Sequence, residues 1–223
     1  RLPYGVIEIE KNAFEGCAEL KLFNIPALTA KVASSAGCVN LSKIHVDVTN
    51  EKYASHDGCL YSADFTTLYW WPEGKRQIHE RFPEQLKRIE DYAFQYTHLP
   101  ELPLPSSVSE LGIGSFYASS LESFTVPSKV VNIPTALFQE CHRLKTVWLG
   151  KDVGTLSAYC FDGCPLEHLY VPVEDFLPLC HEKAFTAQIY QNCVLHVPVG
   201  AGKLYRNKEC WRNFVQIKED IVD

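Results

Sequence analysis

The stretch that decides the fold is Cys160-Phe161-Asp162-Gly163-Cys164-Pro165-Leu166-Glu167-His168-Leu169-Tyr170-Val171-Pro172. Its second half alternates apolar and polar residues and ends on a proline. This pattern predicts a short strand followed by a turn, because proline has no N–H to donate to a strand ladder. Its first half places one phenylalanine among small residues, which predicts a single helical or 3₁₀ turn whose ring fills the core. A unit this small cannot bury its own apolar face.

The same unit recurs along the chain. Its anchor position is held by Phe14, Ser35, Phe94, Phe116, Phe138, Phe161 and Phe185. The last five anchors are separated by 22, 22, 23 and 24 residues. Units of this size become stable only by stacking, so we expect one leucine-rich-repeat solenoid over residues 1–223. It is predicted to be an α/β-type, right-handed coil of about seven turns with a parallel strand ladder.

The repeat is interrupted between Ser35 and Phe94, where the spacing of 59 residues is too long for plain coils. Asp57-Gly58, flanked by short apolar runs, is typical of a tight hairpin turn. The sequence therefore predicts a β-hairpin elaboration of one coil over residues 47–76. The aromatic run Tyr69-Trp70-Trp71 lies in this segment. It is expected to pack against the solenoid, with a ligand site as the alternative.

Composition excludes two classes of function. The net charge of -6 and 21 scattered Lys and Arg residues argue against binding nucleic acid. No stretch approaches the roughly 18 uninterrupted apolar residues of a transmembrane helix. We therefore expect no membrane-spanning segment, and any export signal would lie outside the sequence given.

The nine cysteines separate into two groups by their place in the repeat. Three residues after an anchor, where a small apolar side chain fits, lie Cys17, Cys38, Cys141 and Cys164. These are predicted to be core thiols, and Cys160 is predicted to fill the core at the position before its anchor. Outside the pattern lie Cys59, Cys180, Cys193 and Cys210. A disulfide among these four is left open.

No combination of residues has the spacing of a catalytic, metal or cofactor site. The histidines lack metal-ligand spacing such as His-Glu-x-x-His. Gly200-Ala201-Gly202-Lys203 lacks the Ser or Thr that a phosphate-binding loop needs after its lysine. No nucleophile, base and orienting group converge. We therefore expect a protein that is not an enzyme and that uses neither cofactor nor metal.

The residues between the inward apolar positions of each strand are expected to face solvent. In the C-terminal coils, Trp148, Tyr170 and His196 fall in one column on successive strands. Exposed aromatic rings in a row are typical of interfaces. The candidate partner-binding residues are Trp148, Tyr170, His168, His196, Thr146 and Thr125. The alternative is that these rings stack on one another or pack against the C-terminal segment.

Several motifs together resemble the BspA-like leucine-rich repeat family, common in Bacteroidetes. The first is the recurrent Ala-Phe-x-Gly-Cys-x-x-Leu core, and the second runs from Asn50-x-x-Tyr53 through Asp57-Gly58 to Pro72-x-Gly74-Lys75. The last is the closing pair Leu195-x-Val197-Pro198-x-Gly200 and Trp211-x-x-Phe214, which gives a C-terminal cap over residues 199–223. The resemblance implies an exported protein, extracellular or displayed on the cell surface and sometimes adhesive.

The function expected from the sequence is binding of a host or bacterial surface protein through the exposed strand face. The first alternative is a carbohydrate-binding module, because Trp and Tyr rings beside polar groups such as His168 suit sugar rings. The second is a structural spacer within a larger surface protein.

Overall fold

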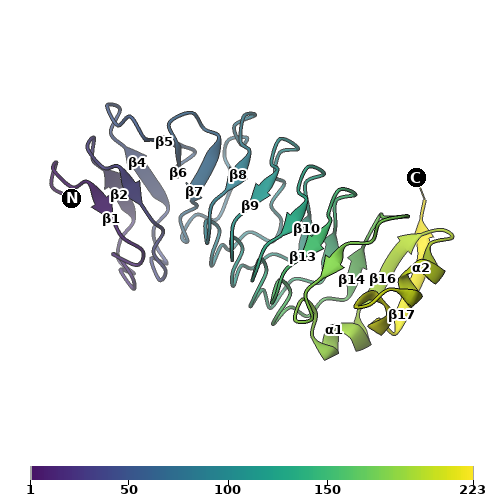
Figure 1. The fold of residues 1–223 in the computed structure, drawn as a ribbon. Coiled ribbons are helices and arrows are strands. Elements are labelled where there is room, and N and C mark those ends of the chain that lie inside the picture. Colours follow the sequence, from purple (N-terminus) through teal and green to yellow (C-terminus); the bar gives the residue numbers. More distant parts are fainter. Residues whose placement is uncertain (1, 223) are drawn as a thin grey trace.

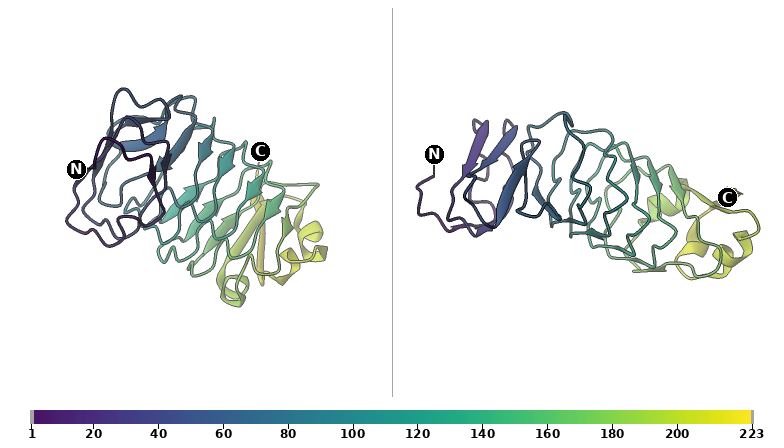
Figure 2. Two further views of the ribbon diagram at one scale, coloured as in Figure 1. Left: turned by 60° about the vertical axis from the view of Figure 1, so that its left-hand side comes forward. Right: turned by 90° about the horizontal axis from the view of Figure 1, so that it is seen from above.

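The computed structural model describes residues 2–222 and arranges them as coils stacked along one long axis (Figure 1). The coils follow one another in sequence order, with the N-terminal strands at one end and the C-terminal helices at the other, as two further views also show (Figure 2). Neighbouring coils are joined by parallel strand pairs. The predicted leucine-rich-repeat solenoid with a parallel ladder is confirmed.

Most coils contribute a longer strand, and these strands carry the surface that we call the strand face. The longer strands are β2 (Leu22–Ile25), β4 (Lys43–Val46), β10 (Ser123–Thr125), β12 (Thr146–Trp148), β14 (His168–Tyr170), β16 (Val194–Pro198) and β17 (Gln216–Ile221). Buried and exposed residues alternate along them, as the sequence predicts for strands with one face on the core. The strands β10, β12, β14, β16 and β17 form one parallel sheet, and β2 and β4 form another.

A second set of two-residue strands precedes the anchor position of each coil. These strands are β1 (Glu8–Ile9), β3 (Lys31–Val32), β8 (Arg88–Ile89), β9 (Glu110–Leu111), β11 (Asn132–Ile133), β13 (Thr155–Leu156) and β15 (Leu179–Cys180). They pair in parallel with the equivalent strands of the neighbouring coils. The coils from β10 to β16 are thus tied to their neighbours along two lines, by the longer strands and by the strands β11, β13 and β15.

The anchor phenylalanines form a continuous spine through the core. Phe94, Phe116, Phe138, Phe161 and Phe185 are all buried, and consecutive rings lie 5.4 to 5.7 Å apart with interplanar angles of 3–18°. Offset stacking at this distance adds to the burial of each ring's apolar area. One ring per coil therefore fixes the spacing of the stack.

The anchor segments are hydrogen-bonded turns and not the helical or 3₁₀ turns that the sequence predicts. In most coils the residues two before and two after the anchor have positive φ, as at Tyr159 (60°) and Gly163 (75°) around Phe161. A left-handed residue on each side of the anchor segment interrupts the run of right-handed residues that a helix needs. The same two positions are occupied by Ala136 (57°) and Glu140 (63°) around Phe138. The described helices all lie near the C-terminus.

The interruption of the repeat is an antiparallel hairpin unit. Its strands are β5 (Tyr53–His56), β6 (Cys59–Ser62) and β7 (Thr67–Trp70), and β7 pairs in parallel with β8 to rejoin the stack. Asp57 and Gly58 connect β5 and β6 with φ of 48° and 74°, the double positive φ of a type I′ turn. Lys75 contacts Asp57 with 2.9 Å between Nζ and Oδ1, and both side chains are buried. This ion pair ties the turn to the segment that follows the hairpin.

The C-terminal coil is closed by short helices and the last strand. These elements are α1 (Ala187–Asn192), α2 (Gly202–Asn207) and the 3₁₀ helix η1 (Trp211–Asn213). The buried Trp211 donates its indole N–H to the carbonyl of Pro178 at 2.9 Å, and the Tyr205 hydroxyl donates to the carbonyl of Val173 at 2.8 Å. Both contacts fasten the cap to the preceding coil.

Cys17 is exposed, so its predicted place in the core is wrong, whereas Cys38, Cys141 and Cys164 are buried. Each buried thiol lies against the anchor carbonyl of the preceding coil, as Cys141 does against Phe116 at 3.0 Å. Among residues 2–222, no coil precedes that of Cys17 to supply such a carbonyl. All nine cysteines are free thiols.

Candidate functional site

The strand face carries the candidate residues in the register that the repeat predicts. Thr125, Trp148, Tyr170 and His196 are successive partners in the parallel ladder, followed by Lys218 on β17. The parallel column Ser123, Thr146, His168, Val194 and Gln216 runs beside it. The structure therefore brings all six predicted site residues into one region of the strand face.

Three rings of this column, Trp148, Tyr170 and His196, form what we call the aromatic stack. The centroids of Trp148 and Tyr170 are 5.0 Å apart, those of Tyr170 and His196 are 4.1 Å apart, and both interplanar angles are 11°. Trp148 is 39% exposed, whereas Tyr170 is half-buried between its two neighbours. The rings thus cover one another's faces, and the end of the stack at Trp148 is the accessible one.

His196 is only 5% exposed, so the expectation that it faces solvent is wrong, and the alternative of rings that stack on one another and pack against the C-terminal segment holds for this residue. The cause is β17, which pairs with β16 in parallel and places Lys218 and Asp220 beside it. The Nδ1 of His196 lies 2.9 Å from the Asp220 carboxylate, and its Nε2 lies 3.0 Å from Nδ1 of His168. A chain of hydrogen bonds from Asp220 through His196 to His168 therefore fixes the imidazole against Tyr170. The strand β17 lies in the C-terminal segment, where the repeat pattern gives no signal for it.

The remaining candidates on this face are accessible. Thr125 is exposed, and Thr146 and His168 are half-buried. These hydroxyl and imidazole groups surround the exposed edge of the aromatic stack. The arrangement presents one large apolar ring with polar groups at its margin.

The second group of candidates, in the hairpin unit, is mostly buried. Trp70 and Trp71 are each 2% exposed and pack against Phe23 and Phe94 at ring distances of 5.9 and 5.3 Å. Both indoles therefore belong to the core, and a ligand role for them is wrong. Tyr69 is half-buried and meets Tyr53 edge-on at 5.2 Å.

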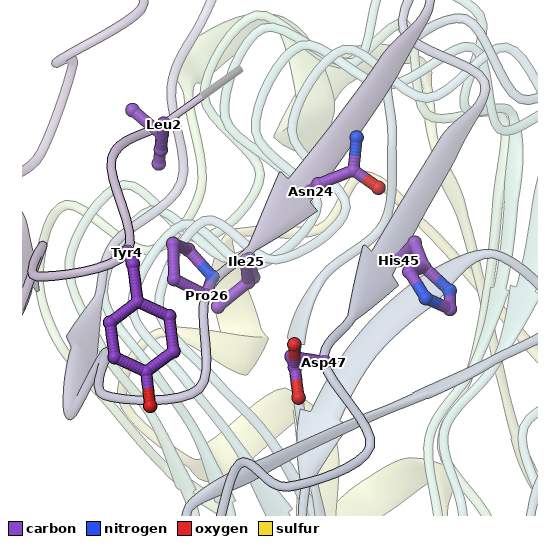
Figure 3. Close-up of a pocket in the computed structure, with 7 residues that line it drawn as sticks. All are labelled: Leu2, Tyr4, Asn24, Ile25, Pro26, His45 and Asp47. Atoms are coloured by element: carbon purple, nitrogen blue, oxygen red, sulfur yellow. The ribbon is translucent and has the colours of Figure 1, made fainter.

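The strand face is also hollowed in several places. Near the N-terminus a cavity of about 470 Å³ is lined by Tyr4, Asn24, His45 and Asp47, with Asn24 and His45 on neighbouring strands (Figure 3). Thr49 donates two hydrogen bonds to Asp47 and holds the pKa of this carboxyl below its ordinary value. This cavity is distant in sequence from the aromatic stack and shares none of its residues.

A second depression, of about 550 Å³, lies next to Thr125 and includes none of the three rings of the aromatic stack in its lining. It is lined by Leu102, Leu104, Val126 and Leu149, together with Thr125, the ladder partner of Trp148. The segment from Glu101 to Leu104 was expected to form a strand like the others, but it has no strand hydrogen bonds. Pro103, where the next coils have Thr125 and Trp148, has no N–H to donate to a strand ladder, so the face opens here.

Within residues 2–222, no group of three His, Cys, Asp or Glu side chains is arranged to hold a metal ion. None of the described helices is long and apolar enough to cross a membrane. The strand face offers groups that can contact a partner: a half-exposed indole, a phenol, an imidazole and neighbouring hydroxyls.

Sequence comparison assigns the fold to a family. The profile of the BspA type leucine-rich repeat region matches residues 1–71 and 73–192 in six copies. The chain belongs to the BspA type leucine-rich repeat family. A search of curated proteins finds no match.

Solved structures of several bacterial proteins share the architecture. A leucine-rich cell surface protein from Faecalibacterium prausnitzii superposes with a TM-score of 0.74 at 24% identity, over 98% of this chain and 56% of that one. A leucine-rich repeat protein from Eubacterium ventriosum gives 0.67 at 25% identity, over 79% and 48%. The pneumococcal vaccine antigen PcpA gives 0.67 at 19% identity, over 91% and 56%. The chain thus spans about half the length of these proteins.

Proposed function

We propose that this chain is a protein-binding module of an exported or surface-displayed protein, and that it binds through the strand face at the aromatic stack. The observation that carries the proposal is the half-exposed pair Trp148 and Tyr170, held rigid on neighbouring strands. Aromatic anchors of this kind contribute much of the binding energy of protein interfaces. Surface display is inferred from the family and from the similarity to the cell surface protein of Faecalibacterium prausnitzii.

Rigidity supports the proposal because an anchor that is already ordered loses little conformational entropy on binding. Trp148 is fixed by Tyr170, which is fixed by His196, which is held in turn by Asp220. Two hydrogen-bonding groups of the neighbouring column, Thr146 and His168, remain partly accessible. A partner would therefore meet a preformed apolar centre with a polar rim.

The carbohydrate alternative has less support in the geometry of the rings. Sugars stack on the faces of aromatic rings, and both faces of Tyr170 are covered by Trp148 and His196. Only the outer face of Trp148 is left for stacking. The spacer alternative assigns no role to the half-exposed indole of Trp148.

The test is a binding screen of the purified chain against an array of purified extracellular proteins, bacterial and host. We expect hits with the wild-type chain that disappear for the double variant Trp148→Ala/Tyr170→Ala. The matched control is Phe176→Ala, because Phe176 is 91% exposed but lies in a loop outside the strand face. Hits that survive the double variant, or that disappear equally with Phe176→Ala, would refute binding at the stack.

A stability measurement separates loss of binding from loss of fold. A stacked aromatic pair contributes roughly 0.5–1.5 kcal/mol beyond its area burial. Trp148→Ala removes one such pair and should lower the Tm by only a few degrees, about 2–4 °C for each kcal/mol. A much larger fall would place the indole in the core and contradict its role as an anchor.

A further inference from the structure

The depression beside Thr125, the ladder partner of Trp148, is a hollow whose shape has a definite cause. On one side the indole stacks on Tyr170. On the other side its ladder partner is Thr125, a small exposed residue, so no ring covers that face among the described residues. The chain neighbours of the indole, Leu149 and Gly150, line the depression of about 550 Å³ together with Thr125.

The hollow exists because one backbone hydrogen bond of the repeat is missing. In the later coils the residue after each strand donates its N–H to the next coil: Val126 to the Trp148 carbonyl and Leu149 to the Tyr170 carbonyl, both at 2.9 Å. The equivalent N–H of Leu104 instead lies 3.0 Å from the Leu102 carbonyl, in a tight turn around Pro103. The Thr125 carbonyl is thereby left without a donor among residues 2–222.

The lining of the hollow is suited to a particular kind of group. Leu102, Leu104, Val126 and Leu149 provide apolar walls, and Glu101 is the single charged side chain in the lining. An apolar side chain fits such walls, and an acidic one would meet Glu101. The vacant acceptor at Thr125 needs an N–H donor within a few ångströms of that apolar group. An extended polypeptide offers both, because each side chain is flanked by a backbone N–H.

We propose that this hollow is a peptide-binding subsite. It takes an extended segment of the partner protein, which places one bulky apolar side chain in the hollow, next to Trp148 on the ladder, and a backbone N–H on the Thr125 carbonyl. The subsite rests on the proposed function and specifies the chemistry of the partner.

The test selects peptides from a phage-displayed random library on the immobilised wild-type chain. Peptides of about 12 residues span roughly 40 Å when extended, enough to cross the hollow. The affinity of each enriched peptide is then measured for the wild type, Thr125→Trp and Asn24→Trp. Thr125→Trp fills the hollow with a ring that continues the stack. Asn24→Trp places the same ring at the same repeat position in a distant coil and is the matched control.

We expect enriched peptides that share a bulky apolar residue, bind Thr125→Trp at least tenfold more weakly, and bind Asn24→Trp as they bind the wild type. Because Thr125→Trp alters a packed sheet, its Tm is compared with that of the control. A second readout uses the wild type alone, in which a bound peptide should shield Trp148 from acrylamide quenching.

Three outcomes would overturn the subsite: no peptide is enriched, enriched peptides bind Thr125→Trp unchanged, or peptides leave the quenching of Trp148 unchanged. If array proteins still bind in a way that needs Trp148 and Tyr170, the proposed function stands while the subsite fails. If neither peptides nor array proteins bind at the stack, both fail. A glycan whose binding is abolished by Thr125→Trp would assign the hollow to a sugar and contradict the proposal.

Discussion

Replacing Lys75 with methionine removes one partner of the ion pair that anchors the hairpin unit. The Lys75 and Asp57 side chains are 5% and 9% exposed, and their charged atoms are 2.9 Å apart. The variant keeps an apolar stem of similar length, so the change isolates the charge. Asp57 then stays buried with its backbone hydrogen bond from His79 at 3.0 Å as the main compensation.

The expected cost follows from that geometry. Leaving one partner of a buried ion pair uncompensated costs about 3–5 kcal/mol. The hydrogen bond that Asp57 still accepts favours the lower end of this range, so we expect the free energy of unfolding to fall by about 3 kcal/mol. With a urea m-value of about 3 kcal/mol/M, the unfolding midpoint should fall by about 1 M.

The assay is urea unfolding of four chains followed by circular dichroism: wild type, Lys75→Met, Asp57→Asn and the double variant. Because the double variant buries no unpaired charge, it should be more stable than the sum of the single losses predicts, by at least about 1 kcal/mol. The matched control is Lys31→Met, which breaks the ion pair with Glu8, whose side chains are 73% and 44% exposed. This control should change the midpoint by no more than the error of measurement.

The same pair predicts a pH dependence. Burial alone raises the pKa of Asp57, but hydrogen bonds from Lys75 and from the His79 N–H outweigh it and hold that pKa below its ordinary value. The stabilisation is therefore present above the unfolded pKa of about 3.9 and is lost as the pH falls through the lower folded pKa. Below about pH 4 the wild type should lose stability more steeply than Asp57→Asn. In the urea experiment, two results would refute the stabilising role of the ion pair. One is a fall in the free energy of unfolding below roughly 1 kcal/mol for Lys75→Met, and the other is a double variant whose loss equals the sum of the two single losses.

Three further predictions concern the repeat itself. Gly163→Ala should lower the free energy of chemical unfolding by about 1–2 kcal/mol, because φ there is 75° and the new methyl would meet Glu140 backbone atoms at 3.2 Å. The control Gly154→Ala should change this free energy little, because no atom lies closer than 3.8 Å to the new methyl. Phe138→Ala should lower the free energy of unfolding by about 3–5 kcal/mol, because the buried ring lies between two stacked neighbours. A loss below roughly 1 kcal/mol would contradict the claim that the stacked anchor rings stabilise the core. In native-state thiol labelling with Ellman's reagent at neutral pH, Cys17 should react first, because it is exposed whereas Cys180 is half-buried and the other seven thiols are buried. A fast phase that survives Cys17→Ser would contradict this.

The periodic features of the fold could be predicted from the sequence because they repeat. The anchor phenylalanines, the alternation along each strand and the Asp57-Gly58 turn each carry a local signal. Paired positive-φ residues around the anchors are harder to predict, because Tyr159 and Glu140 occupy positions that favour glycine. They explain why the expected helical turns are absent.

The candidate site could be predicted only in part. The register that aligns Trp148 with Tyr170 follows directly from the repeat. The burial of His196 does not, because it depends on β17, which comes from a segment without the repeat pattern. The hollow beside Thr125 has a signal in Pro103, but the apolar alternation around it suggested a strand.

The most direct test of binding at the strand face uses the fluorescence of Trp148. The other tryptophans, Trp70, Trp71 and Trp211, are buried, so acrylamide quenching should report mainly on Trp148. In the unbound chain we expect a single accessible fraction that disappears in Trp148→Phe. Saturation with a protein that binds the chain should remove that fraction in the wild type. A protein that binds fully and leaves the quenching of Trp148 unchanged would place the interface elsewhere and contradict the proposed function.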